Sequence, residues 1–264
     1  MVLEDVRKQG ESLRTLTMVP SYPLAVKFYE DPSQFPEGTR RPRDRGRKWA
    51  MCQAWALSRT VGWTIGLTPT ESVCPPCNIL FGWAEPESLD DFVDCWLDMG
   101  ICEDPEAVRR YIEDHAWLEK GRYPGVVFSP LQWTKVDPDV VLLYCNPAQA
   151  GVLITAYIRK TGKSFDSTFR SSVVCATCLI GTMKKGDPAI SIPCGGEKGQ
   201  AMSGDSELIF SFPGDLLGLI VDGLETNKKV PYGRIPTVPN LMHEPELMPT
   251  YAKLEKKLKY VNYP

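Results

Sequence analysis

The chain from residue 126 to residue 144 reads VVFSPLQWTKVDPDVVLLY, two apolar runs separated by a polar loop. Both runs are short, rich in β-branched side chains and bounded by Gly or Pro, which is typical of buried strands. Four other segments have a similar pattern, at 23–29, 64–68, 189–193 and 207–212. We therefore expect a sheet of short strands in which 126–131 and 140–144 are buried.

Between these strands the apolar residues recur with helical spacing. The segments concerned are 3–16, 48–62, 89–99, 105–115, 148–160 and 213–224, with shorter helical starts after Cys74 and within 171–181. Strands and helices follow one another in irregular order, which favours the α+β class over a strictly alternating α/β fold. We expect a single domain over residues 1–235, with a mixed β-sheet flanked by helices and with the Cys-bearing loops converging at one end. Residues 236–264 are predicted to form a Pro-rich tail with a basic helix at 251–260.

The composition is that of an ordinary globular protein, with 264 residues of which 43% are hydrophobic and 24% charged. A net charge of −3 gives no general attraction to nucleic acid, and no aliphatic run is long enough to span a bilayer. The first ten residues, MVLEDVRKQG, are polar and unlike a secretory signal. These features predict a cytoplasmic protein with neither a nucleic-acid partner nor a membrane segment.

Cysteine is unusually frequent, with nine residues against two histidines. Two CxxC motifs stand out, Cys74-Pro75-Pro76-Cys77 and Cys175-Ala176-Thr177-Cys178. Thiolates three residues apart in a turn can converge on one soft metal centre. Cys52 lies near the start of a predicted helix, and Cys194 precedes Gly195-Gly196, where the backbone can approach a ligand closely. These six cysteines are the candidate metal ligands, whereas Cys95, Cys102 and Cys145 are interpreted as packing residues.

The wide separation of the two CxxC pairs is unlike a zinc ribbon or finger and favours an iron–sulfur cluster of the [4Fe–4S] type. We expect Cys52, Cys77, Cys178 and Cys194 to bind it, with Cys74 and Cys175 as substitutes or neighbouring thiols. A zinc ion that staples the loops of a non-catalytic binding module is the main alternative. A thiol–disulfide redox protein and plain packing of the cysteines also remain open.

If the chain is an enzyme, it is expected to be an iron–sulfur oxidoreductase or lyase of anaerobic metabolism, acting on a small oxygenated or acidic substrate. The cluster would serve as Lewis acid or electron relay. Glu197 and Lys198 follow Cys194 closely and are the candidate catalytic residues, with Glu197 as the base. Arg47, Lys48 and Lys198 are candidates for binding an acid group, although the Arg40–Lys48 run also fits a solvated loop. A redox partner protein and a homo-oligomer are compatible with this interpretation.

Several sequence pieces, taken in order, resemble the archaeal and bacterial conserved family known as domain of unknown function 169. They are Pro23-Leu24-Ala25-Val26-Lys27-Phe28, the Cys52–Gly62 helix, Cys77 with Gly82, Ser129-Pro130-Leu131, Pro138-Asp139-Val140-Val141, Ser191-Ile192-Pro193-Cys194-Gly195, and Glu207-Leu208 running into Pro213. The resemblance covers roughly residues 15–235 and implies no reaction. It implies a ligand set of Cys52, Cys77, either Cys175 or Cys178, and Cys194, with Lys198 where members often have another basic residue.

Overall fold

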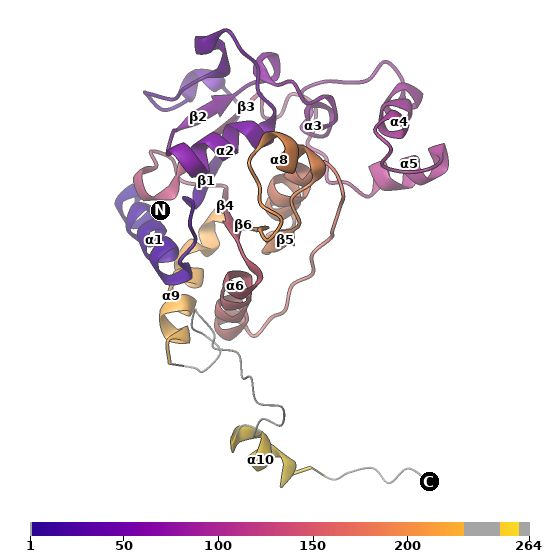
Figure 1. Ribbon diagram of the computed structural model, residues 1–264. Helices are drawn as coiled ribbons and strands as arrows, with labels where there is room; N and C mark the ends of the chain where they lie inside the picture. Colours follow the sequence, from indigo (N-terminus) through magenta and orange to yellow (C-terminus); the bar gives the residue numbers. More distant parts are fainter. Residues whose placement is uncertain (1, 230–248, 259–264) are drawn as a thin grey trace, which may run out of the picture.

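The computed structural model describes residues 2–229 and 249–258, and its centre is a six-stranded sheet with the order β2-β3-β1-β4-β6-β5 (Figure 1). The two runs quoted above form β3 and β4, on either side of β1, and every residue of both strands is buried. The strands are β1 (Leu24–Tyr29), β2 (Ile65–Leu67), β3 (Gly125–Pro130), β4 (Val140–Cys145), β5 (Ala189–Ser191) and β6 (Leu208–Pro213).

Helices cover both faces of the sheet, because alternate residues of each strand point to opposite sides. On one face, Leu24, Val26 and Phe28 of β1 join a core with α2, α3, α4, α5 and the helical segment 174–185. On the other face, Ala25 joins a core with α1, α6 and α9. The helices are α1 (Leu3–Thr17), α2 (Met51–Val61), α3 (Pro75–Leu80), α4 (Leu89–Asp98), α5 (Pro105–Glu113), α6 (Pro147–Thr161), α7 (Thr182–Lys185), α8 (Gly195–Gln200), α9 (Leu217–Asn227) and α10 (Pro249–Glu255).

Local sequence signals define many helix ends. Asn146 caps α6, where its Oδ1 accepts a hydrogen bond from the Gln149 backbone at 2.9 Å, and Pro147 occupies the first helical position. Gly162 ends the same helix with a φ of 67°, a left-handed conformation that favours glycine. Gly62 ends α2 in the same way. These signals explain why the helices predicted at 48–62 and 148–160 form with nearly those bounds.

The α+β class predicted from the sequence is confirmed, but the sheet is not mixed. All five strand pairings in the described residues are antiparallel. Parallel pairing occurs there only at two isolated bridges, Arg40 with Ile65 and Trp49 with Ser72. Strand direction depends on how each connection crosses the sheet, and the pattern of apolar residues within a strand does not encode it.

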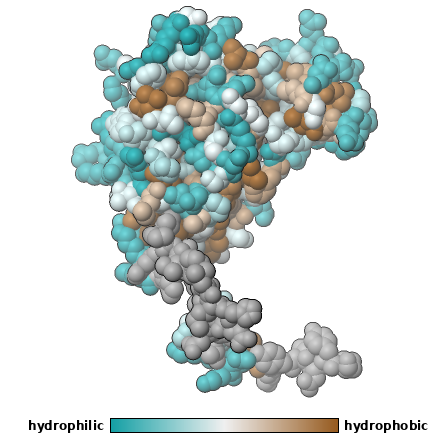
Figure 2. All heavy atoms as spheres, in the orientation of Figure 1, coloured by the Kyte–Doolittle hydropathy of each residue, from teal (hydrophilic) through white to brown (hydrophobic). Residues whose placement is uncertain are grey.

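The predicted boundary between residues 235 and 236 lies outside the described residues. The basic helix predicted at 251–260 corresponds to α10 at Pro249–Glu255. Among the described helices, none combines the length and hydrophobicity that a bilayer crossing requires. Hydrophilic residues cover much of the face shown in Figure 2, interrupted by smaller hydrophobic areas.

Candidate functional site: a pocket lined by five cysteines

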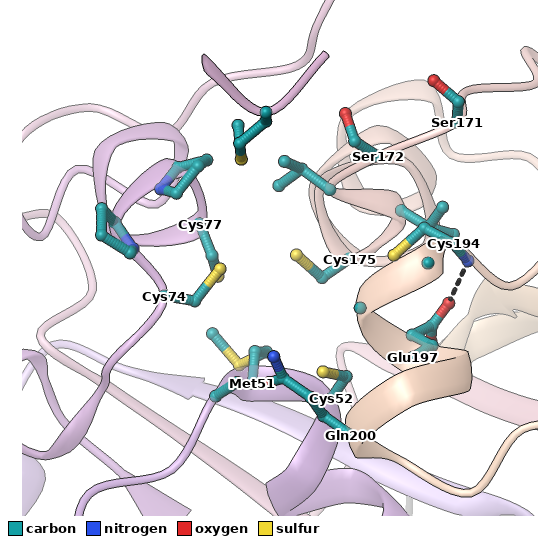
Figure 3. Close-up of a pocket in the computed structure, with 18 of the residues that line it drawn as sticks. Met51, Cys52, Cys74, Cys77, Ser171, Ser172, Cys175, Cys194, Glu197 and Gln200 are labelled. Carbon is teal, nitrogen blue, oxygen red and sulfur yellow. Dashed lines mark hydrogen bonds between the residues drawn. The ribbon is translucent and has the colours of Figure 1, made fainter. Parts of the chain in front are cut away.

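Five of the six candidate cysteines line one pocket of about 480 Å³ on the α2–α3 side of the sheet. Figure 3 shows their side chains around the cavity, contributed by four separate chain segments. Apolar residues such as Met51, Met99 and Ile101 supply most of the remaining wall. All nine cysteines are free thiols in the structure. The lining cysteines are Cys52, Cys74, Cys77, Cys175 and Cys194.

Each of the five cysteines lies at the beginning of a helical segment. Cys52 is the second residue of α2, Cys74 and Cys194 are the N-caps of α3 and α8, and Cys77 lies in the first turn of α3. Cys175 is the second residue of the helical segment 174–185. The first N–H groups of a helix lack partners within the helix, and its positive dipole end stabilises thiolate. The pocket therefore collects thiols at helix starts, where backbone N–H groups can stabilise a thiolate.

Backbone pairing brings together the chain segments that carry Cys52 and Cys74. Both segments are far in sequence from those that carry Cys175 and Cys194. Trp49 and Ser72 form a parallel bridge, in which the Val73 N–H donates to the Trp49 carbonyl at 3.3 Å. This bridge aligns the start of α2 with the start of α3. On the opposite wall, the Val174 N–H donates to the Cys194 thiol, which joins the 174–185 segment to α8.

The thiols differ in their ease of ionisation. A hydrogen bond from Cys77 lowers the pKa of Cys74 to about 7, despite partial burial. The Cys77 thiol is fully buried and contacts both Cys74 and Cys175, and burial raises its pKa well above the usual range. Burial likewise raises the pKa of Cys52 and of Cys194. Cys74 is thus the pocket thiol for which the structure lowers the pKa.

Cys178, a member of the predicted ligand set, does not line the pocket. It lies farther along the 174–185 segment, fully buried in the core. Burial raises the pKa of its thiol well above the usual range. Residues 176–181 form a π-helix rather than an α-helix, so the two cysteines of the second CxxC motif face different surroundings. Of that motif, only Cys175 faces the cavity.

Glu197 lines the pocket as a buried carboxyl group with 1% of its surface exposed. Its Oε1 accepts a hydrogen bond from the Tyr144 hydroxyl at 2.6 Å, and its Oε2 accepts one from the Cys194 N–H at 3.1 Å. The second bond closes a capping box at the start of α8 and fixes the turn that carries Cys194. Burial raises the pKa of Glu197 to about 7, so it can exchange a proton near neutral pH.

The basic residues predicted to bind an acid group do not line this pocket. None of the described residues that line it is Lys, Arg or His. Lys198 lies on α8 outside it and forms an ion pair with Asp205 at 2.7 Å. Arg47 and Lys48 are likewise absent from its wall. The wall that the described residues form is therefore apolar and thiol-rich, and Glu197 is the one carboxylate among them.

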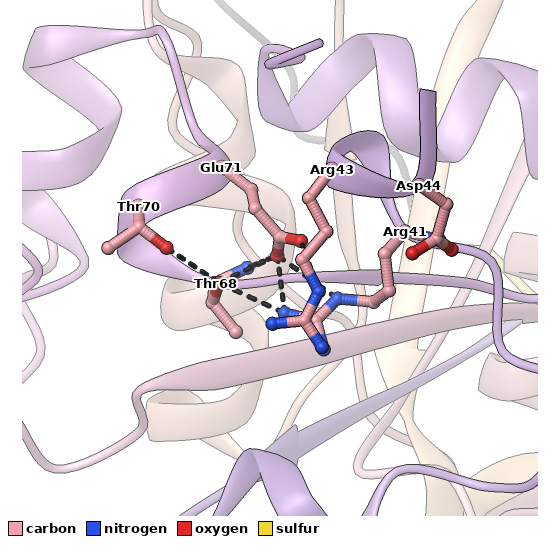
Figure 4. Close-up of polar contacts among 6 residues, drawn as sticks. All are labelled: Arg41, Arg43, Asp44, Thr68, Thr70 and Glu71. Carbon is pink, nitrogen blue, oxygen red and sulfur yellow. Dashed lines mark hydrogen bonds and ion pairs between the residues drawn. The ribbon is translucent and has the colours of Figure 1, made fainter. Parts of the chain in front are cut away.

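Part of the Arg40–Lys48 run has a structural role instead. Figure 4 shows Arg41 and Arg43 directed at Glu71, a carboxylate with 2% of its surface exposed. Arg41 Nη2 lies 2.5 Å from Glu71 Oε2, and Arg43 Nε lies 3.6 Å from Oε1. Because the Glu71 carbonyl also accepts from the Trp49 N–H at 2.9 Å, this ion pair supports the bridge that positions Cys52 and Cys74.

Sequence analysis missed several features of the pocket. Val173 has a φ of 45°, a strained conformation for a β-branched residue, immediately before the segment that carries Cys175. Such strain is concentrated at functional sites. Met99 and Ile101, from the α4–α5 region, and the polar side chains of Ser172 and Gln200 also line the cavity. No local signal marks them, because they reach the cavity only through tertiary packing.

In the part of the chain that the structure describes, no group of three or more His, Cys, Asp or Glu side chains is already arranged as a metal site. The donor set nevertheless consists of thiols, the ligands of iron–sulfur clusters and of soft metals.

The fold and the pocket together define an α+β protein with thiols converging on one cavity. The sequence model of the family DUF169, described as uncharacterised ArCR, matches residues 12–223, and the chain belongs to this family. The uncharacterized protein MJ0308 of Methanocaldococcus jannaschii is 23% identical over 232 residues, covering 87% of this chain and 98% of its own. No solved structure matches the chain. The family resemblance noted in the sequence is confirmed.

Proposed function

We propose that this protein binds an iron–sulfur cluster of the [4Fe–4S] type in the pocket lined by five cysteines. The observation that carries the proposal is the convergence of five thiols, from four chain segments, on one cavity of about 480 Å³. Four thiolates complete the ligand set of such a cluster. The helical N-termini around the cavity supply N–H groups and positive dipole ends suited to an anionic cluster.

The size of the cavity favours a cluster over a structural zinc ion. A closed zinc site holds the ion between four ligands, with zinc–sulfur distances of about 2.3 Å, and leaves no open space beside the metal. The pocket has a larger volume than a closed zinc site needs, and its wall is mostly apolar. It supports a bulkier group with space for a small molecule next to it.

The pocket also changes the choice of ligands. Because Cys178 lies outside the cavity, we assign the four ligands to the five lining cysteines. Cys74 and Cys175, which the sequence analysis gave only as substitutes, thereby become candidate ligands like the other three. A fifth thiol then remains for the substrate side, or replaces a lost ligand.

If only three of the thiols bind the cluster, its fourth iron would have an open position and would act as Lewis acid on a small oxygenated substrate; with four thiolates bound, the cluster would act as electron relay. Glu197, buried beside Cys194, is the group that would move a proton there. The absence of cations among the lining residues favours a neutral substrate over a strongly acidic one. A cytoplasmic, oxygen-poor location and a redox partner protein complete the proposal, since exposed clusters and free thiols are sensitive to oxidation.

The test is to measure iron, acid-labile sulfide and zinc per chain on anaerobically purified full-length protein, together with its visible spectrum. We expect about four iron and four sulfide per chain, the content of one such cluster. Replacing Cys74, Cys77 and Cys175 together by Ser should abolish both, because only two pocket thiols remain and neither a four-thiolate nor a three-thiolate ligand set can form. Cys95→Ser is the matched control, since Cys95 lies on α4 outside the pocket wall, and it should retain the full content.

A further variant distinguishes the ligand set taken from the pocket lining from the set predicted by sequence alone, which includes Cys178. Cys178→Ala should retain iron and sulfide, because its thiol does not face the cavity. Stoichiometric zinc without sulfide would instead indicate the stapled binding module. Absence of both metals, before and after anaerobic reconstitution with iron and sulfide, would refute the cluster.

Thiol–disulfide exchange is a second candidate, favoured by one observation. Cys74 has a pKa lowered to about 7 and contacts the buried Cys77, the arrangement of an attacking and a resolving thiol. A metal-free protein in which Cys74 and Cys77 form a reversible disulfide would support this candidate.

A further inference from the structure

A second pocket, of about 280 Å³, lies along the 174–185 segment beyond the residues that face the thiols. Cys175 in the first turn of this segment faces the first pocket, whereas Thr177, Gly181, Lys184 and Lys185 line the second. The π-helix at Ala176–Gly181 contributes to its wall, and such irregular helices are frequent at functional sites. The pocket shares no lining residue with the thiol cavity.

Three cationic side chains line this second pocket. The Arg170 side chain is 8% exposed, and its Nη2 lies 2.8 Å from Asp114 Oδ2, so these two charges are paired. Lys184 and Lys185 are exposed, and neither forms an ion pair within the described residues. Asp166, also exposed, is the remaining acid of the wall. With Arg170 and Asp114 compensating each other, two lysines face one carboxylate.

Hydroxyl groups that can donate hydrogen bonds line the second pocket beside the two lysines. Thr177 accepts from Arg170 Nη1 at 3.1 Å, and Ser167 accepts from the Ile190 N–H at 2.8 Å, so both hydroxyl protons can be donated to a ligand. Thr168 adds a third hydroxyl. Burial lowers the pKa of His115, so its ring contributes no charge at neutral pH. Ammonium groups and hydroxyl donors that converge on a small cavity are the chemistry of anion recognition.

We propose that this pocket binds the phosphate group of a small molecule, held by Lys184, Lys185 and the hydroxyls of Ser167, Thr168 and Thr177. A dianionic phosphate matches two ammonium groups better than a single carboxylate does, and its three terminal oxygens accept several hydrogen bonds at once. The site does not depend on the proposed cluster, because its residues are separate from the thiol pocket.

The experiment is calorimetric titration of the full-length protein with inorganic phosphate at pH 7.5 and constant ionic strength, repeated with succinate. We expect saturable binding of one phosphate per chain and weaker binding of succinate. The double variant Lys184→Gln/Lys185→Gln should bind phosphate at least about tenfold more weakly, because it removes both ammonium groups and their charge-assisted hydrogen bonds. Asp166→Asn should strengthen binding, because it removes a carboxylate that repels the ligand.

A matched control carries the same change in net charge at another place. Lys256 and Lys257 are an exposed adjacent pair after α10, and Lys256→Gln/Lys257→Gln should bind phosphate like the unmodified chain. If both double variants weakened phosphate binding equally, the weakening would result from the change in net charge alone, and the proposed site would be refuted. Unsaturable phosphate binding, or tighter binding of succinate than of phosphate, would overturn it as well.

Discussion

Glu197 is the residue whose ionisation is most closely tied to the candidate site. Its carboxyl holds both the Tyr144 hydroxyl and the Cys194 backbone, and Arg59 lies above the Tyr144 ring with its guanidinium carbon 3.7 Å from the centroid. Arg59 in turn pairs with Glu207 at 2.9 Å. A chain of polar contacts therefore connects the wall of the thiol pocket with the start of β6.

This arrangement predicts how the stability of the metal-free protein depends on pH. The pKa of Glu197 is about 7 in the folded chain, above the ordinary glutamate value of 4.5, so between these pH values the folded state retains a proton that the unfolded state has lost. The resulting stabilisation is complete below pH 4.5 and disappears as the pH rises through 7. The difference is on the order of 3 kcal/mol.

Urea unfolding at several pH values measures this dependence. Glu197→Gln should flatten the curve between pH 4.5 and 7, because the side chain no longer titrates. Glu11→Gln, at an exposed position on α1, is the control and should leave the slope unchanged. An identical slope in the Glu197 variant and the unmodified protein would contradict the assigned proton.

At the scale of elements, α6 and α9 cover the sheet face opposite the thiol pocket and approach each other closely at one glycine. A Cβ added to Gly223 of α9 would lie 2.6 Å from the Ala156 carbonyl oxygen and 3.0 Å from its Cβ. Backbone atoms of a packed helix cannot move aside as a flexible side chain can. The close packing of the two helices therefore requires glycine at this position.

Gly223→Ala should lower the free energy of unfolding by about 1–3 kcal/mol, because the steric cost of overpacking exceeds the gain in helix propensity. Gly151→Ala on α6 provides the opposite case, since a Cβ there meets nothing within 4 Å. That variant should be more stable by roughly 0.5–1 kcal/mol. Chemical denaturation measures the free energy of unfolding of both variants. Equal stabilisation by the two alanines would contradict the close contact between Gly223 and Ala156.

At the scale of the whole molecule, α4 and α5 form a unit at one side of the sheet (Figure 1). They contact each other more extensively than they contact any other helix or strand. Polar contacts tie α5 to the wall of the thiol pocket, among them the Ser172 N–H donating to the Tyr111 hydroxyl at 3.2 Å. Met99 and Ile101, just after α4, lie in that wall. The connection after α4 therefore forms part of the pocket wall, while α4 and α5 themselves have few close contacts with the sheet.

Amide hydrogen exchange should be faster in α4 and α5 than in the central strands β1, β3 and β4. Local opening requires less free energy where a unit has few contacts with the core. Occupation of the thiol pocket should slow exchange in residues 96–117, because a bound group would contact the part of this segment that lines the pocket. Mass spectrometry after deuterium exchange measures both effects. Equal protection of the α4–α5 unit and the central strands would refute this prediction.

The sequence alone was sufficient for most of the strands and longer helices, the α+β class and the family, although it did not predict α8 and placed the start of α9 too early. Apolar runs such as 140–144, the cap at Asn146 and the glycines at 62 and 162 act over a few residues, so their effects can be predicted locally. The CxxC spacing, together with the helix start at Cys52 and the glycines after Cys194, also singled out six cysteines, five of which line the pocket. The direction of strand pairing could not be predicted, because it depends on how distant segments connect.

Tertiary structure alone decided which cysteines meet and what surrounds them. Cys52 and Cys74 come together through the Trp49–Ser72 bridge, whereas Cys178 faces the core although it is only three residues from Cys175. The tertiary structure also places Arg41 against Glu71, and it brings no cationic side chain among the described residues into the wall of the thiol cavity. The physical reason is that residue types and spacing determine which groups can ionise or bind a metal. Their proximity, burial and charge environment arise from contacts between segments far apart in the chain.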